Sequence, residues 1–183
     1  MLCNCFGGGT FMSKLMHTPY RIGNIVISNR IVKSAMFEYC ANQGRITDQH
    51  RQIYEDAARG GCGLIITGME AISSTAGNGP GMIHTEYDGY LEDMRSIVSK
   101  VHRYSSRIFV QLQHAGPRTD WKNGYDRFAS SPIKVADGII YHAATKDELA
   151  KVVHDFVLMR YLRHQDDHFL FHGILCVHHI CSI

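Results

Sequence analysis

The chain has 183 residues, of which 45% are hydrophobic and 20% are charged, and its formal net charge is +2. This composition is typical of a globular domain that can bury a hydrophobic core. Lysine and arginine are scattered and form no basic stripe, which argues against a nucleic-acid partner. No run of about 18 apolar residues predicts a membrane span.

Residues 1–15 are predicted to be a leader that takes no part in the fold. They lack the basic start and apolar core of a secretory signal. The six cysteines of the chain follow no regular spacing, so we expect reduced thiols and a cytoplasmic protein.

The first expected elements are β-type. Two short apolar runs surround Gly23 and Asn24 and predict a hairpin that leads into a strand. Residues 30–36, RIVKSAM, are predicted to form that strand. A helix is expected from Asp48 to Arg59, because its apolar residues recur at helical spacing and glycines follow it.

Two further pairs of strand and helix are expected. The apolar run at 63–67 predicts a strand buried on both faces, and RIFVQL at 107–112 predicts another. The helix between them has one apolar face, made of Leu91, Met94, Ile97, Val98 and Val101. The third helix is expected to begin at Thr145, with Glu148 completing a capping box. Its apolar stripe is predicted to contain Leu149, Val152, Val153 and Phe156.

This alternation of strands and helices predicts an α/β fold with parallel strands. Two architectures are open at this point, a doubly wound sheet and a (β/α)8 barrel. In both, the chemistry lies at the carboxyl ends of the strands. That rule selects three segments as candidate site residues: Ser34–Tyr39, Thr67–Glu70 and Gln111–His114.

The third strand ends in polar side chains. Gln111 and Gln113 share one face of the strand, and His114 is expected on the other face. A glutamine amide at a strand end can pair with a polar ligand ring, because it both donates and accepts hydrogen bonds. It can equally be a structural amide bonded to a neighbouring loop, and the pattern alone leaves both readings open.

Two other patterns predict no site. The glycines of the loop at 73–81 do not lie at a strand-to-helix turn, as a dinucleotide fingerprint requires. The histidines of residues 163–183 match no standard zinc spacing, so we expect no bound metal. Because these residues differ in composition from the rest of the chain, they are predicted to be an aberrant tail.

Several segments together resemble the Old Yellow Enzyme family of FMN-dependent NAD(P)H:flavin oxidoreductases and ene-reductases. They are NRIVKSAMFEY, EDAARGGCGLIITG and VQLQHAG, preceded by TPYRIGNIVISNRIV, which resembles the family's N-terminal hairpin. The resemblance runs from about Met16 to Phe156. It implies a (β/α)8 TIM barrel, of which residues 16–162 would supply about three β/α units.

The resemblance also implies roles for individual residues. The flavin would be contacted by Ser34, Ala35, Met36 and Phe37 of the first strand, by the backbone of Met69 after the second, and by the amide of Gln111 in the third. Tyr39 would face the substrate as the catalytic residue. A flavin's pyrimidine edge offers donors and acceptors that an amide can match, and hydrogen bonds there tune the electron sink of the ring.

The sequence departs from the family pattern at three points. Phe37 stands where the family usually has a small threonine or cysteine, and Pro117 replaces an arginine. No fourth-strand pair of His-His or His-Asn is present, and the family's phosphate-binding loops come later in the barrel than this sequence reaches.

Two functions remain open. One is an FMN-dependent oxidoreductase that passes hydride from NAD(P)H through the flavin to an activated alkene or similar small-molecule acceptor. The alternative is a non-catalytic, incomplete fragment of such an enzyme, with an open sheet edge that favours self-association.

Overall fold

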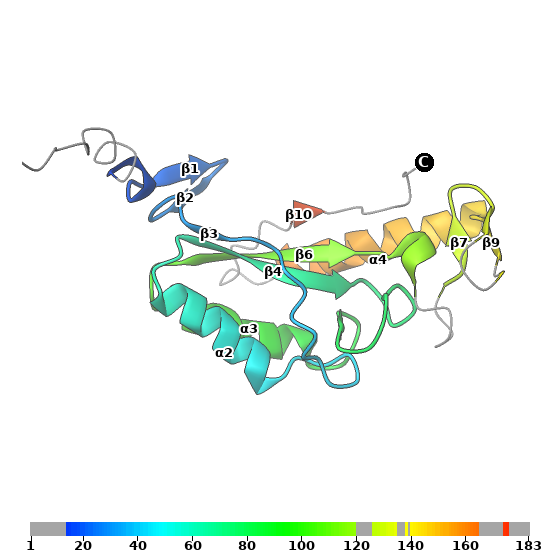
Figure 1. Ribbon diagram of the computed structural model, residues 1–183, viewed down its shortest axis with the longest axis horizontal. Coiled ribbons are helices and arrows are strands. Elements are labelled where there is room, and N and C mark those ends of the chain that lie inside the picture. The colour runs from blue at the N-terminus through cyan, green and yellow to red at the C-terminus, as the bar shows by residue number, and fades with distance from the viewer. Residues whose placement is uncertain (1–13, 120–125, 135–137, 139, 165–173, 176–183) are drawn as a thin grey trace, which may run out of the picture.

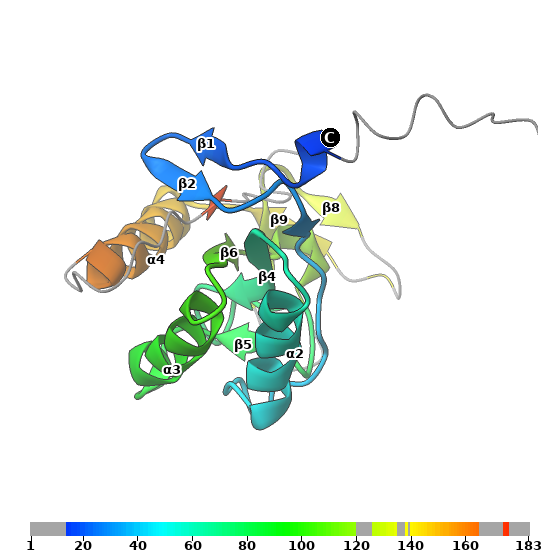
Figure 2. The same cartoon turned by 90° about the vertical axis from the view of Figure 1, so that its left-hand side faces the viewer.

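The computed structural model describes residues 14–119, 126–134, 138, 140–164 and 174–175. Its main sheet contains five parallel strands: β5 (Ile83–His84) pairs with β4 on the same edge as β3, and the other four lie in the order β3, β4, β6, β10. They are β3 (Val32–Lys33), β4 (Leu64–Ala71), β6 (Arg107–Gln113) and β10 (Ile174–Leu175). The helices are α2 (Asp48–Arg59), α3 (Tyr90–His102) and α4 (Lys146–His164). Figure 2 shows these helices arranged around one side of the sheet.

The order of the strands bears on the two predicted architectures. The four strands β3, β4, β6 and β10 lie side by side in their order along the chain, so they show no reversal of the kind that a doubly wound sheet needs. Consecutive β/α units that all advance in one direction are the arrangement of a TIM barrel. The described residues therefore form an α/β fragment that contains the three predicted β/α units.

A fourth parallel strand lies within the segment that we expected to be an aberrant tail. Strand β10 pairs with β6, with Ile174 opposite Gln111 and Leu175 opposite Leu112. This is the edge where a fourth β/α unit would begin. The rest of the predicted tail, 165–173 and 176–183, lies outside the described residues, as does most of the predicted leader.

The prediction of a strand over residues 30–36 is wrong in extent. Strand β3 pairs with β4 only at Leu64 and Ile65. Farther along the same edge of β4, the short strand β5 (Ile83–His84) takes the pairing positions at Glu70 and Ala71. Between these two pairings, residues 66–69 of β4 have no ladder partner on this edge, and residues 34–39 form no regular strand although Met36 lies against Gly68.

The predicted hairpin is confirmed. Strands β1 (Tyr20–Ile22) and β2 (Ile25–Ile27) pair antiparallel and lie beside the amino ends of the main strands (Figure 1). A small apolar cluster joins the hairpin to the sheet, and it contains Ile25, Ile27, Leu64 and Phe109. Phe109 therefore marks the face of β6 that lies opposite the helices.

The larger core lies between the sheet and the helices. It includes Tyr54 of α2, Met94 and Ile97 of α3, and Val152 and Phe156 of α4. The predicted stripe of the last helix is partly wrong, because Leu149 and Val153 are 38% and 61% exposed. The side of α4 that bears Val152, Phe156 and Met159 packs against the core. The neighbouring side, which bears Leu149 and Val153, faces away from the core.

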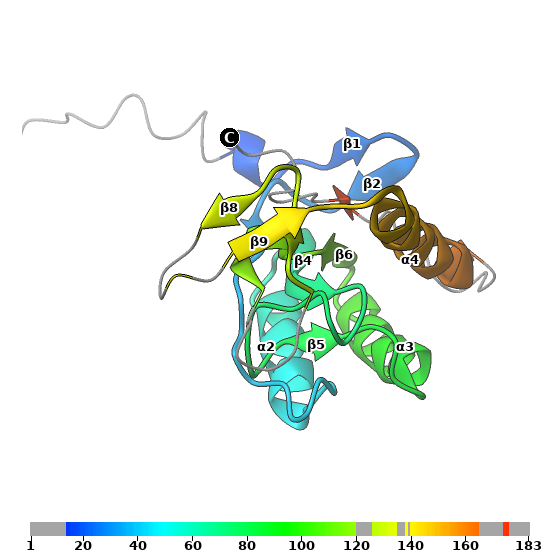
Figure 3. The same ribbon diagram turned by 90° about the vertical axis from the view of Figure 1, so that its right-hand side faces the viewer.

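The connection between β6 and α4 forms a small sheet of its own. It contains β7 (Phe128–Ala129), β8 (Ile133–Lys134) and β9 (Ile140–Ala143) in the order β7, β9, β8. Figure 3 shows this sheet in front of the carboxyl ends of β4 and β6. Helix α4 then starts with the predicted capping box, in which Glu148 N donates to Thr145 Oγ1 at 3.2 Å and Thr145 N donates to Glu148 Oε2 at 2.8 Å.

Candidate functional site

Backbone hydrogen bonds tie together the loops at the carboxyl ends of the strands. His84 N donates to Gly44 O at 2.9 Å, which joins the loops after β3 and β4. Ala115 N donates to Ala76 O at 2.8 Å, which joins the loops after β4 and β6. These backbone bonds hold the loops that follow β3, β4 and β6 against one another, next to the segments that the strand-end rule selected.

Met69 and Gln111, two of the predicted flavin contacts, lie directly opposite each other on β4 and β6. Gln111 follows Phe109 by two residues, so both side chains lie on the face of β6 opposite the helices. Thr67 Oγ1 accepts the backbone N–H of Gln111 at 3.1 Å. Both predicted side chains are half-buried, and within the described part of the chain the Gln111 amide makes no side-chain hydrogen bond.

An irregularity in β4 brings these residues into register. The pairing of β4 with β6 shifts between Ile66 and Met69, where one extra residue is accommodated. A bulge of this kind redirects the side chains beyond it. It leaves Met69, and not Gly68, opposite Gln111.

Gly68 lies against the segment that follows β3. Its N–H points to Glu38 Oε1 and to the Tyr54 hydroxyl, each at 3.3 Å. A Cβ at this position would overlap the Glu38 carboxylate and lie 2.6 Å from the carbonyl oxygen of Met36. Only glycine therefore allows residues 36–38 to pack on β4.

Glu38 is a buried acid in a segment that the strand-end rule selected, but no role was predicted for it. Its side chain is 5% exposed and pairs with Lys33 Nζ at 3.2 Å. Burial raises the pKa of the neighbouring Tyr54 well above its ordinary value, and the negative charges of Glu38 and Glu70 raise it further. The one sequence signal for a buried acid was the charged Glu38 between two aromatic residues, Phe37 and Tyr39, in a segment that the strand-end rule had selected.

The first-strand residues differ in exposure. Ser34 is exposed, Ala35 and Phe37 are half-buried, and Met36 is 66% exposed. Because the Met36 carbonyl lies against Gly68, the segment runs beside β4 just before Met69. The structure thus brings Met36, Met69 and Gln111 to neighbouring positions at one end of the sheet.

Tyr39 has an unusual backbone conformation. Its φ is +55°, in the left-handed region that costs roughly 1–2 kcal/mol for a residue with a side chain. Its side chain is 71% exposed, and its ring centroid lies 3.9 Å from that of Phe37. The predicted substrate-facing residue is therefore available to solvent, and its ring lies against that of Phe37 at a tilt of 43°.

His114 and Gln113 have structural roles in this fold. His114 is 2% exposed and Gln113 is 3% exposed. Gln113 Nε2 lies 3.7 Å from the sulfur of Met82. His114 Nδ1 accepts the N–H of Gly116 at 3.0 Å, so its ring proton is on Nε2, which donates to Asp126 Oδ2 at 3.2 Å.

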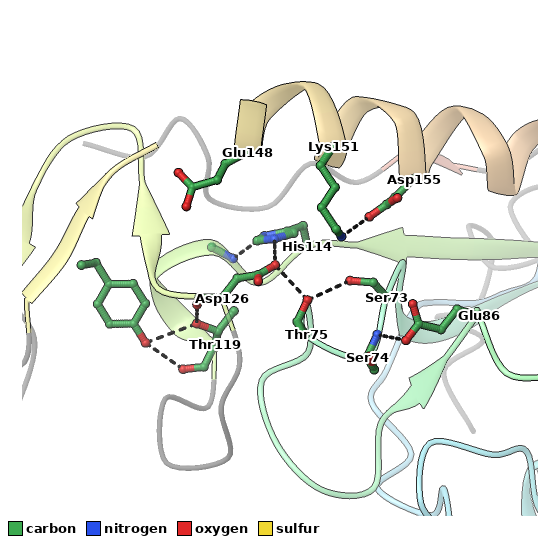
Figure 4. A network of polar contacts seen from close by, with 12 residues as sticks. Ser73, Ser74, Thr75, Glu86, His114, Thr119, Asp126, Glu148, Lys151 and Asp155 are labelled. Atoms are coloured by element: carbon green, nitrogen blue, oxygen red, sulfur yellow. Dashed lines mark hydrogen bonds and ion pairs between the residues drawn. The ribbon is translucent and has the colours of Figure 1, made fainter. Parts of the chain in front are cut away.

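Asp126 connects three segments around His114 (Figure 4). Its Oδ2 also accepts the hydroxyl of Thr75 at 3.1 Å, and its N–H donates to Thr75 O at 3.0 Å. Burial alone would raise the pKa of Asp126, but the hydrogen bonds from His114 and Thr75 hold that pKa below its ordinary value. Because 12 residues separate Asp126 from His114, no sequence signal indicated this contact.

Replacing Asp126 with asparagine is expected to lower the free energy of unfolding by about 1.5 kcal/mol at pH 7, because a charge-assisted hydrogen bond is lost. The folded-state pKa is depressed, so the contribution is present above the unfolded-state pKa and is lost as the pH falls through the folded-state value. Urea unfolding at pH 7 measures the change. Asp48→Asn is the matched control, because that side chain is fully exposed, and an unchanged midpoint in Asp126→Asn would contradict the prediction.

Neither a metal site nor a membrane helix is found within the described ranges. No group of three or more His, Cys, Asp or Glu side chains is placed there to hold a metal ion. No helix in the same part of the chain is both long and apolar enough to cross a membrane. The tail histidines 168, 172, 178 and 179 lie outside the described residues.

The sequence profile of the NADH:flavin oxidoreductase / NADH oxidase family matches residues 15–159. The chain belongs to this family. The predicted resemblance to Old Yellow Enzymes is thereby confirmed, and the cofactors that we expected, FMN with NAD(P)H as the reductant, are those of this family.

Two relatives and one solved structure illustrate the similarity. The chain is 32% identical over 142 residues to an NADH oxidase of Thermoanaerobacter brockii, covering 75% of this chain and 22% of that protein. It is 29% identical over 150 residues to 12-oxophytodienoate reductase 1 of Oryza sativa subsp. japonica, covering 76% and 39%. The Old Yellow Enzyme structure from Pichia sp. AKU4542 matches with a TM-score of 0.71 and 22% identity, covering 78% and 41%. The chain therefore spans less than half the length of each.

Proposed function

We propose that this chain is the flavin-ring-binding part of an FMN-dependent oxidoreductase that passes hydride from NAD(P)H through the flavin to an activated alkene or a similar acceptor. The observation that carries the proposal is the pair Met69 and Gln111, directly opposed across β4 and β6. Family membership supports it. Because the chain covers under half of its relatives, the proposal treats it as one part of such an enzyme.

The residues at this end of the sheet fit the flavin ring. The Gln111 amide offers both a donor and an acceptor, and it makes no side-chain hydrogen bond to the described residues, so a pyrimidine edge could use it. Gly68 carries no side chain where the strand bulges. The exposed side chain of Met36 and the half-buried side chain of Met69 supply apolar contacts beside that amide.

The proposed roles follow from these positions. When bound, FMN accepts hydride from NAD(P)H and delivers it to the acceptor. Residues 34–37 and the backbone of Met69 would hold one side of the ring, and Gln111 would orient its pyrimidine edge. Tyr39 would face the acceptor, and its phenol could donate a hydrogen bond or a proton there.

A second candidate function is a folded fragment that performs no turnover. Its basis is the described part of the fourth strand, where no polar side chain is placed to bind the acceptor's carbonyl group. The short strand β10 carries Ile174 and Leu175, and neither side chain can supply that hydrogen bond.

Self-association through an open edge of the sheet belongs to this second candidate function. A reducing cytoplasmic location is proposed with either candidate function, in keeping with the free thiols of Cys40 and Cys62.

The substitution Gln111→Leu tests the assigned cofactor contact. We expect the dissociation constant of FMN to rise about tenfold, because roughly two hydrogen bonds are lost. Titration with FMN, followed by flavin fluorescence, measures it. Gln113→Leu is the matched control, because that amide is in the same strand but is buried against Met82. Equal FMN affinity in wild type and Gln111→Leu would remove Gln111 from the site.

A further inference from the structure

Two aromatic side chains form a pair in the segment that follows β3. The ring centroids of Phe37 and Tyr39 are 3.9 Å apart, and the ring planes are tilted by 43°. Phe37 is half-buried and packs against the large core, whereas Tyr39 is 71% exposed. One ring is therefore anchored in the protein, and the other rests on it and faces solvent.

The backbone holds Tyr39 in place but leaves its ring to be supported by Phe37. Ala41 N donates to Gly81 O at 3.1 Å, and Gly81 lies so close that a Cβ there would be 3.0 Å from Tyr39 O. These contacts stabilise the left-handed conformation of Tyr39, which points its side chain out of the loop. Within the described part of the chain, Phe37 is the aromatic ring in contact with that of Tyr39.

We infer that Phe37 is a positioning residue that holds the Tyr39 ring as part of an apolar platform, and that this platform selects planar, aryl-conjugated acceptors over small aliphatic ones. This inference rests on the proposed function and names its acceptor class. Phenylalanine has no hydroxyl or thiol, so its side chain makes no conventional hydrogen bond to a ligand. Aromatic pairs contribute through ring geometry in addition to buried area.

The size of the expected preference for aryl-conjugated acceptors follows from the free energy of an aromatic contact. An aromatic contact of this kind is worth about 0.5–1.5 kcal/mol, which corresponds to roughly twofold to tenfold in affinity. An enone that carries a phenyl ring can gain this contact on the platform. An aliphatic cyclic enone has the same carbonyl and alkene but no aromatic ring, so it gains none.

The first arm of the test examines the pair in protein without flavin. Tyrosine ring signals are recorded by NMR, with Tyr39 assigned from Tyr39→Phe, in wild type, Phe37→Leu and Phe156→Leu. We expect an upfield ring-current shift of the Tyr39 signals that Phe37→Leu abolishes. Phe156→Leu removes a ring from α4, elsewhere in the core, and should leave them unchanged. Identical Tyr39 signals in wild type and Phe37→Leu would overturn the inference.

The second arm measures acceptor preference by titrating the same proteins with benzylideneacetone and with cyclohexenone, following the Tyr39 signals. Wild type should bind benzylideneacetone about two to ten times more tightly. Phe37→Leu should lose the preference, while Phe37→Tyr, which keeps the ring, should retain it. A preference that persists in Phe37→Leu, or is absent in wild type, would overturn the inference.

The two proposals fail in different ways. FMN uptake is read separately from the flavin absorbance of the protein after gel filtration. A chain that takes up no FMN contradicts the proposed function, whereas the ring signals and the enone preference still decide the role of Phe37. Amide spectra with native dispersion in Phe37→Leu show that a loss of preference does not come from unfolding.

Discussion

Replacing Gly68 with alanine is expected to lower the free energy of unfolding by about 3 kcal/mol. The added methyl group would meet the Glu38 carboxylate and the carbonyl oxygen of Met36, the latter at 2.6 Å. A side chain can move away, but the Met36 carbonyl is backbone, so β4 and the segment after β3 must separate. Overpacking of this kind typically costs about 1–3 kcal/mol, and separating the two segments would also weaken the hydrogen bond from the Gly68 N–H to Glu38.

Urea unfolding of Gly68→Ala measures this effect, and Gly60→Ala is its matched control. Gly60 has ordinary right-handed φ and ψ values at the end of α2, so alanine is compatible with its backbone. The double variant Gly68→Ala with Glu38→Ala separates the two clashes, since only the backbone clash with Met36 remains in it. Wild-type stability in Gly68→Ala would show that β4 and residues 36–38 are not packed as described.

The protein is expected to lose about 3 kcal/mol of stability between pH 7 and pH 4 through His50 alone. His50 is 1% exposed, and burial together with the nearby Arg51 charge lowers its pKa from 6.5 to about 4. Between these values the unfolded chain binds more protons than the folded one. The stabilisation is therefore complete above about pH 6.5 and is lost as the pH falls toward 4, by roughly 1.4 kcal/mol per pH unit.

The variant His50→Gln isolates this effect from the acidic groups. His50 Nδ1 accepts the N–H of Thr47 at 3.2 Å at the start of α2, and a glutamine at this position can accept the same bond without titrating. The free energy of unfolding is measured against pH for both proteins. The two curves should diverge below about pH 6.5, and parallel curves down to pH 4 would contradict the assigned pKa.

Much of the fold was predictable from local pattern. The apolar run that forms β4, the helical spacing of α2 and the capping box of α4 each follow from interactions between residues close in sequence. The neighbourhood of Met69 and Gln111 was predictable too, since consecutive parallel strands end at the same edge of a sheet. Their direct opposition also depends on the bulge at Gly68, which has no local signal beyond the glycine itself.

The features that escaped prediction depend on long-range contacts. Strand β3 pairs with only two residues of β4, and β5, about 50 residues later in the chain, pairs farther along the same edge. Asp126 meets His114 only because the small sheet after β6 returns to the end of that strand. Leu149 and Val153 match the apolar spacing of α4 but face away from the core. The prediction failed here because apolar periodicity alone does not fix which side of a wide apolar stripe packs against the core.

The most direct test of the central claim, that this chain holds a flavin ring beside Met69 and Gln111, is a titration of the wild-type protein with FMN and with riboflavin. We predict saturable quenching of flavin fluorescence at one flavin per chain. Riboflavin should bind within about twofold of FMN, because phosphate sites of TIM barrels are frequently formed by loops after the seventh and eighth strands. A folded chain that leaves the fluorescence of both flavins unchanged would contradict the account.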